Sequence, residues 1–572
     1  MPNMSRRLPA RPLLAALLGC ALLAGCQART NVSATGNAPA QFTHVFLTIN
    51  QIWFNSSGAA AATDSSWAKF TLPTPQTLDL VNLNNGALSQ FVSNLKLDAG
   101  SYAQIMLILA DSTDALTTSA QGAGAATNDE VDYVDALDVA HTAPLAVLNA
   151  AQGISIGTSL TVAASSTTVG GSTSTAPSTT TSTAATSSGA TATTVATPGV
   201  TITSFTLDFD ATRDLVPMSL SGQSAYLLNP HPQAYDARSS GTIQGAVSLT
   251  DLPALTSADL PDVQVAAESL SSDGTRHVII KTTRVGTDGT FVLYPLSTAS
   301  GAPSSYDLVI HGPTIQTQII KSVPVTTAAP ASATAVLGTL TLTPATPFLV
   351  NFNPGSPAAP TSSVVGFYQT LPLPSDVPYL VETRAVDPTS GLFATDQALA
   401  GGGVQYGTYV AGGTITLTTA NPTQGAGAYS IGAINPAFGI PTLGTTVTAP
   451  GTTATALFTM TAAPLPTGAS ANAITGTVTA PSSQGFDHAA LFLTHGGALV
   501  AAAALNSDQS TLTLNGIAPG GSSAASYPAG VYYAEVWAWS SSNPLGTLTR
   551  TAAATAIDMS AGNAAGVALT IQ

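Results

Sequence analysis

The chain has 572 residues, a formal net charge of −15 at pH 7 and only 8% charged residues. An acidic protein repels the phosphate backbone of DNA and RNA, so we expect no nucleic acid among its partners. The length favours about three to four domains of roughly 150 residues each. Cys20 and Cys26 are the only cysteines, so packed cores rather than disulfides must stabilise these domains.

Residues 1–25 have the pattern of a bacterial signal peptide. The basic residues Arg6, Arg7 and Arg11 precede an apolar run over 13–23. This run is too short for a membrane-spanning helix, which needs about 20 apolar residues. A basic start, a short apolar run and small residues at its end predict a cleaved secretory signal.

The signal ends in Leu23-Ala24-Gly25-Cys26, which resembles the lipobox of bacterial lipoproteins. The resemblance implies that Cys26 becomes the first residue of the mature protein and carries palmitate and the other lipid chains. Lipidation of Cys26 would make the membrane a partner of the protein. Gln27 follows, where an Asp would retain such a protein at the inner membrane, so the resemblance favours an outer membrane lipoprotein on the periplasmic or cell-surface face.

The rest of the chain predicts an all-β protein with several β-sandwich domains in tandem. Short runs rich in Val, Thr and Ile alternate with Gly, Pro, Asn and Asp. The small polar residues 26–40 predict a flexible tether. We expect an N-terminal β-sandwich domain over 41–236, with a short helix over 83–95. The Ser/Thr/Ala tract 163–198 cannot supply a core and predicts a disordered insert in that domain.

The order of short motifs in this first domain resembles one bacterial lipoprotein family. A strand over 44–54 is followed by Trp67, Leu78-Asp79-Leu80 and the turn Leu97-Asp98-Ala99-Gly100-Ser101-Tyr102. Phe205-Thr206-Leu207-Asp208-Phe209-Asp210 and Tyr226-Leu227-Leu228-Asn229-Pro230 come later. This order is similar to that of the domain-of-unknown-function family 4382, which implies a structural rather than a catalytic role for these motifs.

Three smaller sandwiches are expected after it, over 238–345, 346–466 and 467–572. The first has Gly241-Thr242-Ile243-Gln244-Gly245-Ala246-Val247, Asp288-Gly289-Thr290-Phe291 and Tyr306-Asp307-Leu308 in order. This resembles the carboxypeptidase-regulatory-like, transthyretin-like β-sandwich. An apolar pattern repeats at Phe291, Leu293 and Leu296, at Tyr429, Ile431 and Ile434, and at Leu512, Leu514 and Ile517. We expect each module to have its own core, with Leu514 and Val536 in the last one.

Gly153-Ile154-Ser155-Ile156-Gly157 matches the G-x-S-x-G pattern of serine hydrolases. That chemistry requires a strand, a sharp turn and a helix, so that the serine oxygen is exposed. Here β-branched residues flank Ser155 and the sequence continues as a strand. We therefore favour an ordinary strand serine over a nucleophile.

Two groups of carboxylates are candidates for other chemistry. Calcium takes six to eight oxygens, but the acidic run lacks the usual spacing of a calcium loop, so we expect an exposed solvated loop at Asp129, Glu130, Asp132, Asp135 and Asp138. Asp208 and Asp210 are two residues apart on a strand and share one face. They could form half of an acid–base pair, but with Arg213 nearby a surface ion-pair cluster is the simpler interpretation.

The remaining candidates lie in the last module. His488 and His495 are seven residues apart on one predicted strand and would face opposite ways, which argues against a shared metal. Trp537 and Trp539 share a strand face, and could stack on a sugar or belong to the core; we favour the core.

No complete catalytic, cofactor-binding or metal-binding constellation is found in the sequence. We therefore expect a non-catalytic envelope lipoprotein, not an enzyme, with a structural or binding role such as adhesion, carbohydrate recognition or protein recognition. Two alternatives stay open. One is a secreted serine hydrolase that uses Ser155, and the other is a scaffold subunit of an envelope assembly.

Overall fold

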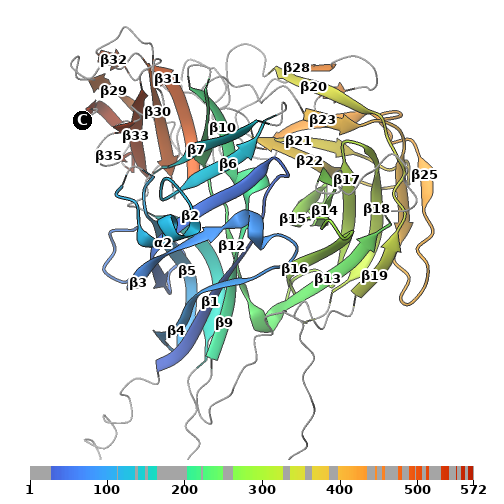
Figure 1. Cartoon of the computed structure of the whole chain (residues 1–572), viewed down its shortest axis with the longest axis horizontal. Helices are drawn as coiled ribbons and strands as arrows, with labels where there is room; N and C mark the ends of the chain where they lie inside the picture. Colours follow the sequence, from blue (N-terminus) through green and yellow to red (C-terminus); the bar gives the residue numbers. More distant parts are fainter. Residues whose placement is uncertain are drawn as a thin grey trace, which may run out of the picture.

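The computed structural model describes residues 27–570, except 113, 136–138, 149–152, 164–201, 221–222, 249–261, 326, 328–334, 354–363, 386–396, 435–444, 448–453, 458–473, 480–487, 496–497, 506–510, 514–529, 540–548, 551–554 and 561–563. The described elements are almost all strands, arranged in eight sheets, which confirms the all-β prediction (Figure 1). No helix within these ranges is long and apolar enough to cross a membrane. The predicted insert 163–198 lies outside the described residues apart from Ala163, and the signal peptide and Cys26 also lie outside them.

The N-terminal domain has twelve of these strands and four short helices. Its first six strands are β1 (Gln27–Asn37), β2 (Phe42–Asn55), β3 (Ala68–Asp79), β4 (Ser89–Asp98), β5 (Gly100–Leu109) and β6 (Glu130–Val134). The next six are β7 (Ala140–Val147), β8 (Ile154–Val162), β9 (Ile202–Asp210), β10 (Leu215–Leu220), β11 (Gln223–Leu228) and β12 (Gln233–Asp236). The short helices are η1 (Leu80–Leu83), α2 (Thr118–Ala123), α3 (Ala211–Asp214) and η2 (Ala237–Ser239).

Two sheets of this domain enclose its core. One has the order β12-β9-β1-β4, and the other has β10-β11-β7-β6-β2-β5-β8 with β3 paired to β2. Phe205, Leu207 and Phe209 point inward from β9 and pack with Ile52 and Phe54 from β2. Asp208 and Asp210 alternate with these residues, so they lie on the opposite face of β9, as their spacing predicted.

The prediction of a flexible tether over 26–40 is wrong for 27–37, which form β1. This strand runs parallel to β9 and antiparallel to β4, near the centre of its sheet (Figure 1). Thr30, Val32 and Ala34 are fully buried. Small residues look like a linker in the sequence, but here they fit the space between two sheets. The helix expected over 83–95 is also wrong, because η1 ends at Leu83 and β4 covers 89–98.

The other strands form three modules of similar topology. The second module has β13 (Ser240–Val247), β14 (Gln264–Leu270), β15 (His277–Arg284), β16 (Thr290–Ser297), β17 (Ser305–Gly312), β18 (Ile315–Pro324) and β19 (Ala335–Leu340). The third has β20 (Pro347–Asn353), β21 (Val364–Gln369), β22 (Tyr379–Ala385), β23 (Gln397–Ala400), β24 (Val404–Thr408), β25 (Thr418–Ala420), β26 (Tyr429–Ile434), β27 (Thr445–Val447) and β28 (Ala454–Leu457).

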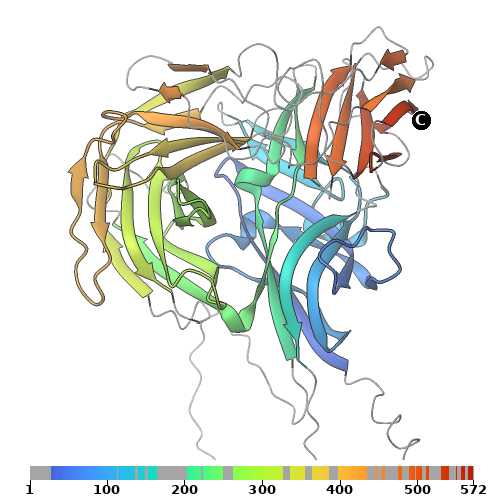
Figure 2. The ribbon, with the colours of Figure 1, turned by 180° about the vertical axis from the view of Figure 1, so that it is seen from behind.

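The fourth module has β29 (Ile474–Thr479), β30 (His488–His495), β31 (Ala498–Leu505), β32 (Thr511–Thr513), β33 (Val531–Trp539), β34 (Thr549–Arg550), β35 (Thr555–Asp558) and β36 (Ala564–Thr570). Its strands lie above the N-terminal domain and far from β25 in both views (Figures 1 and 2).

In each module the first strand pairs antiparallel with a middle strand and parallel with the last one. The three-stranded sheets are β16-β13-β19, β23-β20-β28 and β32-β29-β36. The opposing sheets repeat the order β15-β14-β17-β18, β22-β21-β26-β27 and β31-β30-β33-β34. The apolar repeat noted in the sequence agrees with this topology for Phe291 and Leu512, which lie on the counterpart strands β16 and β32. It fails for Tyr429, which lies on β26, the counterpart of β17.

The second and third modules are not separate bodies. Strands β24 and β25 of the third module extend the sheet of the second, giving the order β15-β14-β17-β18-β24-β25. Both faces of this sheet are covered: Val265, Leu308 and Ile310 belong to the core of the second module. Their neighbours Ala266, Val309 and Ile319 pack into the core of the third module, together with Phe348, Phe367, Tyr379 and Ile431. The expectation of one independent core per module is therefore wrong for this pair.

Candidate functional site

Ser155 lies within strand β8, which continues past it to Val162 without a turn into a helix. Its flanking residues Ile154 and Ile156 are buried in the core, so Ser155 is on the other face of the sheet. Its Oγ accepts a hydrogen bond of 2.6 Å from Gln104 Nε2. The strand–turn–helix geometry that exposes a serine nucleophile is not present at this position.

The acidic run is not the exposed loop that we expected. Asp129 and Glu130 are buried, with 0% and 2% of their surface exposed. Asp129 Oδ1 accepts from Thr48 N at 2.8 Å, and Glu130 Oε2 accepts from Ala126 N at 2.8 Å. Burial raises the pKa of Asp129 well above its usual value, and the nearby charge of Asp111 adds to this. These two carboxylates accept hydrogen bonds from backbone N–H groups that would otherwise lack a partner. The spacing of charges in the sequence does not show that such acceptors are needed here.

Asp132 and Asp135 are half-buried on or beside β6, and Asp138 lies outside the described residues. Within the described part of the chain, no group of three or more His, Cys, Asp or Glu residues is placed to hold a metal ion. In the last module, His488 and His495 stand at the two ends of β30. Trp537 is 2% exposed, as expected for a core residue.

Asp208 and Asp210 meet basic residues where the N-terminal domain joins the second and third modules. The sequence predicted an ion-pair cluster at the surface, but Asp208 is buried, and Asp210 and Arg213 are half-buried. Lys281 of β15 contacts Asp208 directly, with 3% and 9% of their side chains exposed. Lys281 is 73 positions away in the chain, so no local pattern identifies it as the partner of Asp208.

Asp210 and Asp214 hold the short helix α3 in this junction. Asp210 Oδ1 accepts from Thr212 N at 3.2 Å and so caps the helix. Burial alone would raise the pKa of Asp214, but the charges of Arg213 and His231 lower it below its usual value. Arg213 also donates to the backbone oxygen of His231 at 3.0 Å. The charged groups at this strand end therefore bond mainly to one another and to the backbone.

A cavity of about 280 Å³ lies beside this cluster, at the meeting point of three modules. Its polar lining includes Asp210 and Arg213 from the N-terminal domain and Arg276 from the second module. Its apolar wall includes Ile279 of the second module and Leu380 of the third. Burial raises the pKa of the nearby Tyr368 to about 12, so this phenol stays protonated at neutral pH.

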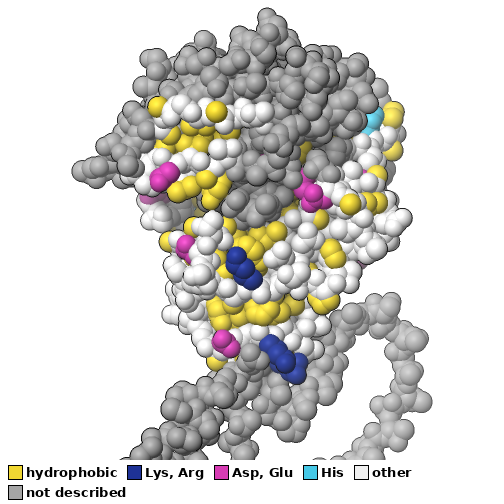
Figure 3. Space-filling model, turned by 90° about the vertical axis from the view of Figure 1, so that its left-hand side faces the viewer, with side chains coloured by type: hydrophobic (Ala, Val, Ile, Leu, Met, Phe, Trp, Pro, Cys, Tyr) yellow, Lys and Arg dark blue, Asp and Glu magenta, His cyan; other side chains and the backbone are white. Residues whose placement is uncertain are grey.

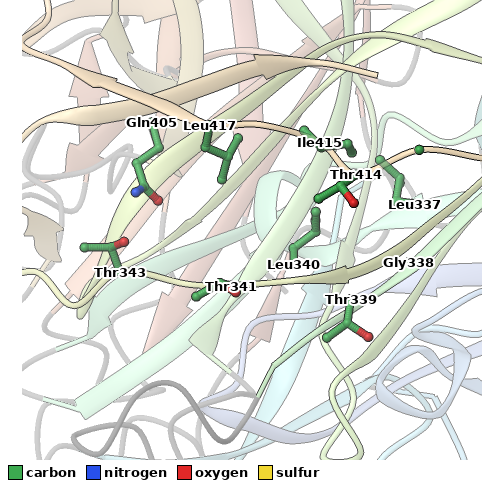
Figure 4. Close-up of a pocket in the computed structure, with 11 residues that line it drawn as sticks. Leu337, Gly338, Thr339, Leu340, Thr341, Thr343, Gln405, Thr414, Ile415 and Leu417 are labelled. Carbon is green, nitrogen blue, oxygen red and sulfur yellow. The ribbon is translucent and has the colours of Figure 1, made fainter. Parts of the chain in front are cut away.

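A second, larger hollow of about 430 Å³ lies between β19 and the β24–β25 hairpin, and we call it the hairpin groove. Figure 4 shows Gln405 and Thr343 at one end of it and Leu337 and Ile415 at the other. None of the eleven residues that line it is charged. The groove exists because β24 pairs with β18: Gln318 Nε2 donates to Gln405 Oε1 at 2.8 Å. Sequence analysis missed this groove, since its two walls are distant in the chain.

The side of the molecule that lies on the left in Figure 1, away from the hairpin groove, has few charged side chains among its described residues. On the face in Figure 3, acidic and basic side chains are scattered and separated by uncharged ones. This agrees with the 8% of charged residues in the whole chain. No strongly charged patch is visible on that face among the described residues.

Comparison with known proteins identifies the first domain. Residues 27–230 match the family described as "Domain of unknown function (DUF4382)". The predicted resemblance is confirmed for this part of the chain, and the match begins at the first residue of β1. No curated protein matches the chain. Among solved structures, "The Bacillus anthracis TIE protein" aligns over 96% of this chain and 73% of that chain, with 7% identity and a TM-score of 0.14, which is too slight to carry an argument.

Proposed function

We propose that this protein is a non-catalytic lipoprotein of the outer membrane that is anchored through Cys26 and binds an uncharged polar ligand in the hairpin groove. The observation that carries the binding role is the groove itself. It lies where two modules share a sheet, and binding sites occur preferentially between such units. Thr339, Thr341 and Gln405 offer hydroxyl and amide groups that both donate and accept hydrogen bonds. Such a lining suits a neutral carbohydrate better than an ionic ligand.

The later modules are, in this proposal, carboxypeptidase-regulatory-like β-sandwiches that present the groove away from the anchor. Their common strand order supports a single module type. The first alternative is a scaffold role, in which the groove receives an uncharged peptide segment of another envelope protein. The second is a hydrolase that uses Ser155. Labelling of Ser155 by a fluorophosphonate probe would support the hydrolase and contradict our proposal.

The binding proposal is tested on the full chain with an array of neutral oligosaccharides, followed by titration calorimetry. Thr414 lines the groove, and Thr416 stands two residues away in the same connection but is not part of the lining. A Thr414→Lys change should weaken binding by about tenfold or more, equal to about 1.4 kcal/mol. The matched Thr416→Lys change should leave binding unaltered. An equal effect of both changes, or no neutral sugar bound, would contradict this function.

The anchor is tested separately, by a Cys26→Ala change. The variant should not incorporate a palmitate analogue and should leave the membrane fraction. If it stays in the membrane and is still labelled, the protein is anchored elsewhere.

A further inference from the structure

The contact between Lys281 and Asp208 joins two regular strands of different domains. Lys281 Nζ lies directly against Asp208 Oδ1. Asp208 is on β9, which is paired on both sides by β1 and β12, and Lys281 is on β15, which is paired to β14. The backbones on both sides are therefore held by sheet hydrogen bonds. Further bonds hold the two domains together nearby, including Asn85 N to Thr283 Oγ1 at 3.0 Å.

Such a contact is an unfavourable place for two charges. Moving an ammonium and a carboxylate out of water is costly for each ion, and the desolvation penalty can exceed the attraction between them. Burial, with a contribution from Asp210, raises the pKa of Asp208 to about 6, although Lys281 and Arg213 act in the opposite direction. Condensation to an amide uses an amine and a carboxylic acid in their neutral forms, and burial favours the neutral form of the Asp208 carboxyl group.

We propose that Lys281 and Asp208 are joined by an isopeptide bond, which links the N-terminal domain covalently to the second module. The Nζ lone pair attacks Asp208 Cγ, and a C–N bond forms. The C–O bond to the carboxyl hydroxyl breaks, and this hydroxyl leaves with one proton of the amine as water. The step requires no oxidant, reductant or cofactor.

Two features of the site favour this direction of the reaction. In water, the free ions are preferred over the amide because water stabilises both charges, and that stabilisation is largely lost here. The fold also holds the amine against the carboxyl group, so that a reaction between distant parts of the chain becomes effectively unimolecular. The chain has no cysteine after Cys26, so an isopeptide would supply a covalent link that disulfides cannot.

The same chain contains a natural comparison in Lys321 and Asp376. Lys321 Nζ bonds both carboxylate oxygens of Asp376, at 3.0 and 3.2 Å, and 27% of the Lys321 side chain is exposed. Water reaches this pair and stabilises its charges. We therefore expect Lys321 and Asp376 to remain an ordinary ion pair.

The test is mass spectrometry of the denatured full chain after digestion with trypsin and chymotrypsin. An isopeptide blocks cleavage after Lys281, so residues 277–284 should appear within a branched peptide that also contains Asp208. That peptide should weigh less than the sum of its two parts by the mass of one water molecule. Recovery of residues 277–281 as a free linear peptide, with no branched product, would overturn the proposal.

Intact mass provides a second readout that does not depend on folding of a variant. The wild type should be lighter than a Lys281→Met variant by the side-chain difference plus one water, whereas Lys321→Met should show the side-chain difference alone. An Asp208→Ala variant should likewise lose the mass deficit. Dehydration at Asp273-Gly274 or Asp288-Gly289 would also remove water, but it would persist in Lys281→Met and Asp208→Ala. A deficit that survives in both of these variants would therefore contradict the isopeptide.

Discussion

His311 Nδ1 lies 3.3 Å from Glu382 Oε2, across the boundary between the second and third modules. The other carboxylate oxygen, Oε1, lies 3.0 Å from Arg384 Nη1. His311 and Glu382 are both buried. Burial alone would raise the pKa of Glu382, but Arg384 and His311 lower it to about 2. The folded state therefore favours the ionised form of Glu382.

This carboxylate should make stability depend on pH in acid. Because its pKa is lower in the folded than in the unfolded protein, its contribution is complete above about pH 4.5 and is lost as the pH falls toward 2. A Glu382→Gln change should reduce stability at pH 6 by roughly 1–3 kcal/mol and flatten this acid dependence. Thermal melts between pH 2 and 6 measure both effects. The exposed Asp98→Asn serves as control, and an unchanged acid slope in Glu382→Gln would contradict the assignment.

The two glycines around Ser155 should differ sharply in tolerance to Ala. Gly153 has a φ of +79°, and a Cβ there would lie 2.5 Å from Ile108 Cδ1 and 2.7 Å from Leu107 O. A Cβ at Gly157 would meet nothing within 4 Å. We expect Gly153→Ala to cost at least about 1–2 kcal/mol and Gly157→Ala to leave the melting temperature nearly unchanged. Equal effects of both would mean that β8 begins in a different conformation.

The third module should not fold when it is separated from the second. Its core includes Ala266, Val309 and Ile319, and β24 pairs with β18 of the preceding module. A fragment of residues 346–466 should therefore lack a cooperative melt, whereas 238–466 should melt as one unit with a β-type circular dichroism spectrum. A cooperative transition of the shorter fragment would show that the shared sheet is dispensable.

The last module is still expected to fold alone as residues 467–572, as the sequence predicted. Within it, Val536 is fully buried on β33, whereas Val531 on the same strand is 41% exposed. Val536→Ala should destabilise by roughly 2 kcal/mol, and Val531→Ala should have little effect. Chemical denaturation of the two variants distinguishes them. A similar loss of stability in both variants would show that the register of β33 is wrong. Leu514, the other predicted core residue, lies outside the described residues.

Local sequence patterns were sufficient for several features of this protein. Runs of β-branched residues between turn residues predicted an all-β chain, and the motifs from Trp67 to Pro230 pointed to the family that residues 27–230 match. The alternation at Asp208 and Asp210 placed both on one face of β9. These predictions succeeded because strand periodicity depends only on neighbouring residues.

Features that depend on distant partners were decided by the tertiary structure. Residues 27–37 have the composition of a linker, yet they form β1 because β4 and β9 supply the hydrogen bonds and the cover that small residues need. Asp208 looked like a surface carboxylate until the fold brought Lys281 against it. Neighbouring residues are enough to indicate which segments can be strands and which face of each strand is apolar. The pairing of strands and the burial of charges follow from the three-dimensional fold, since both depend on residues far away in the chain.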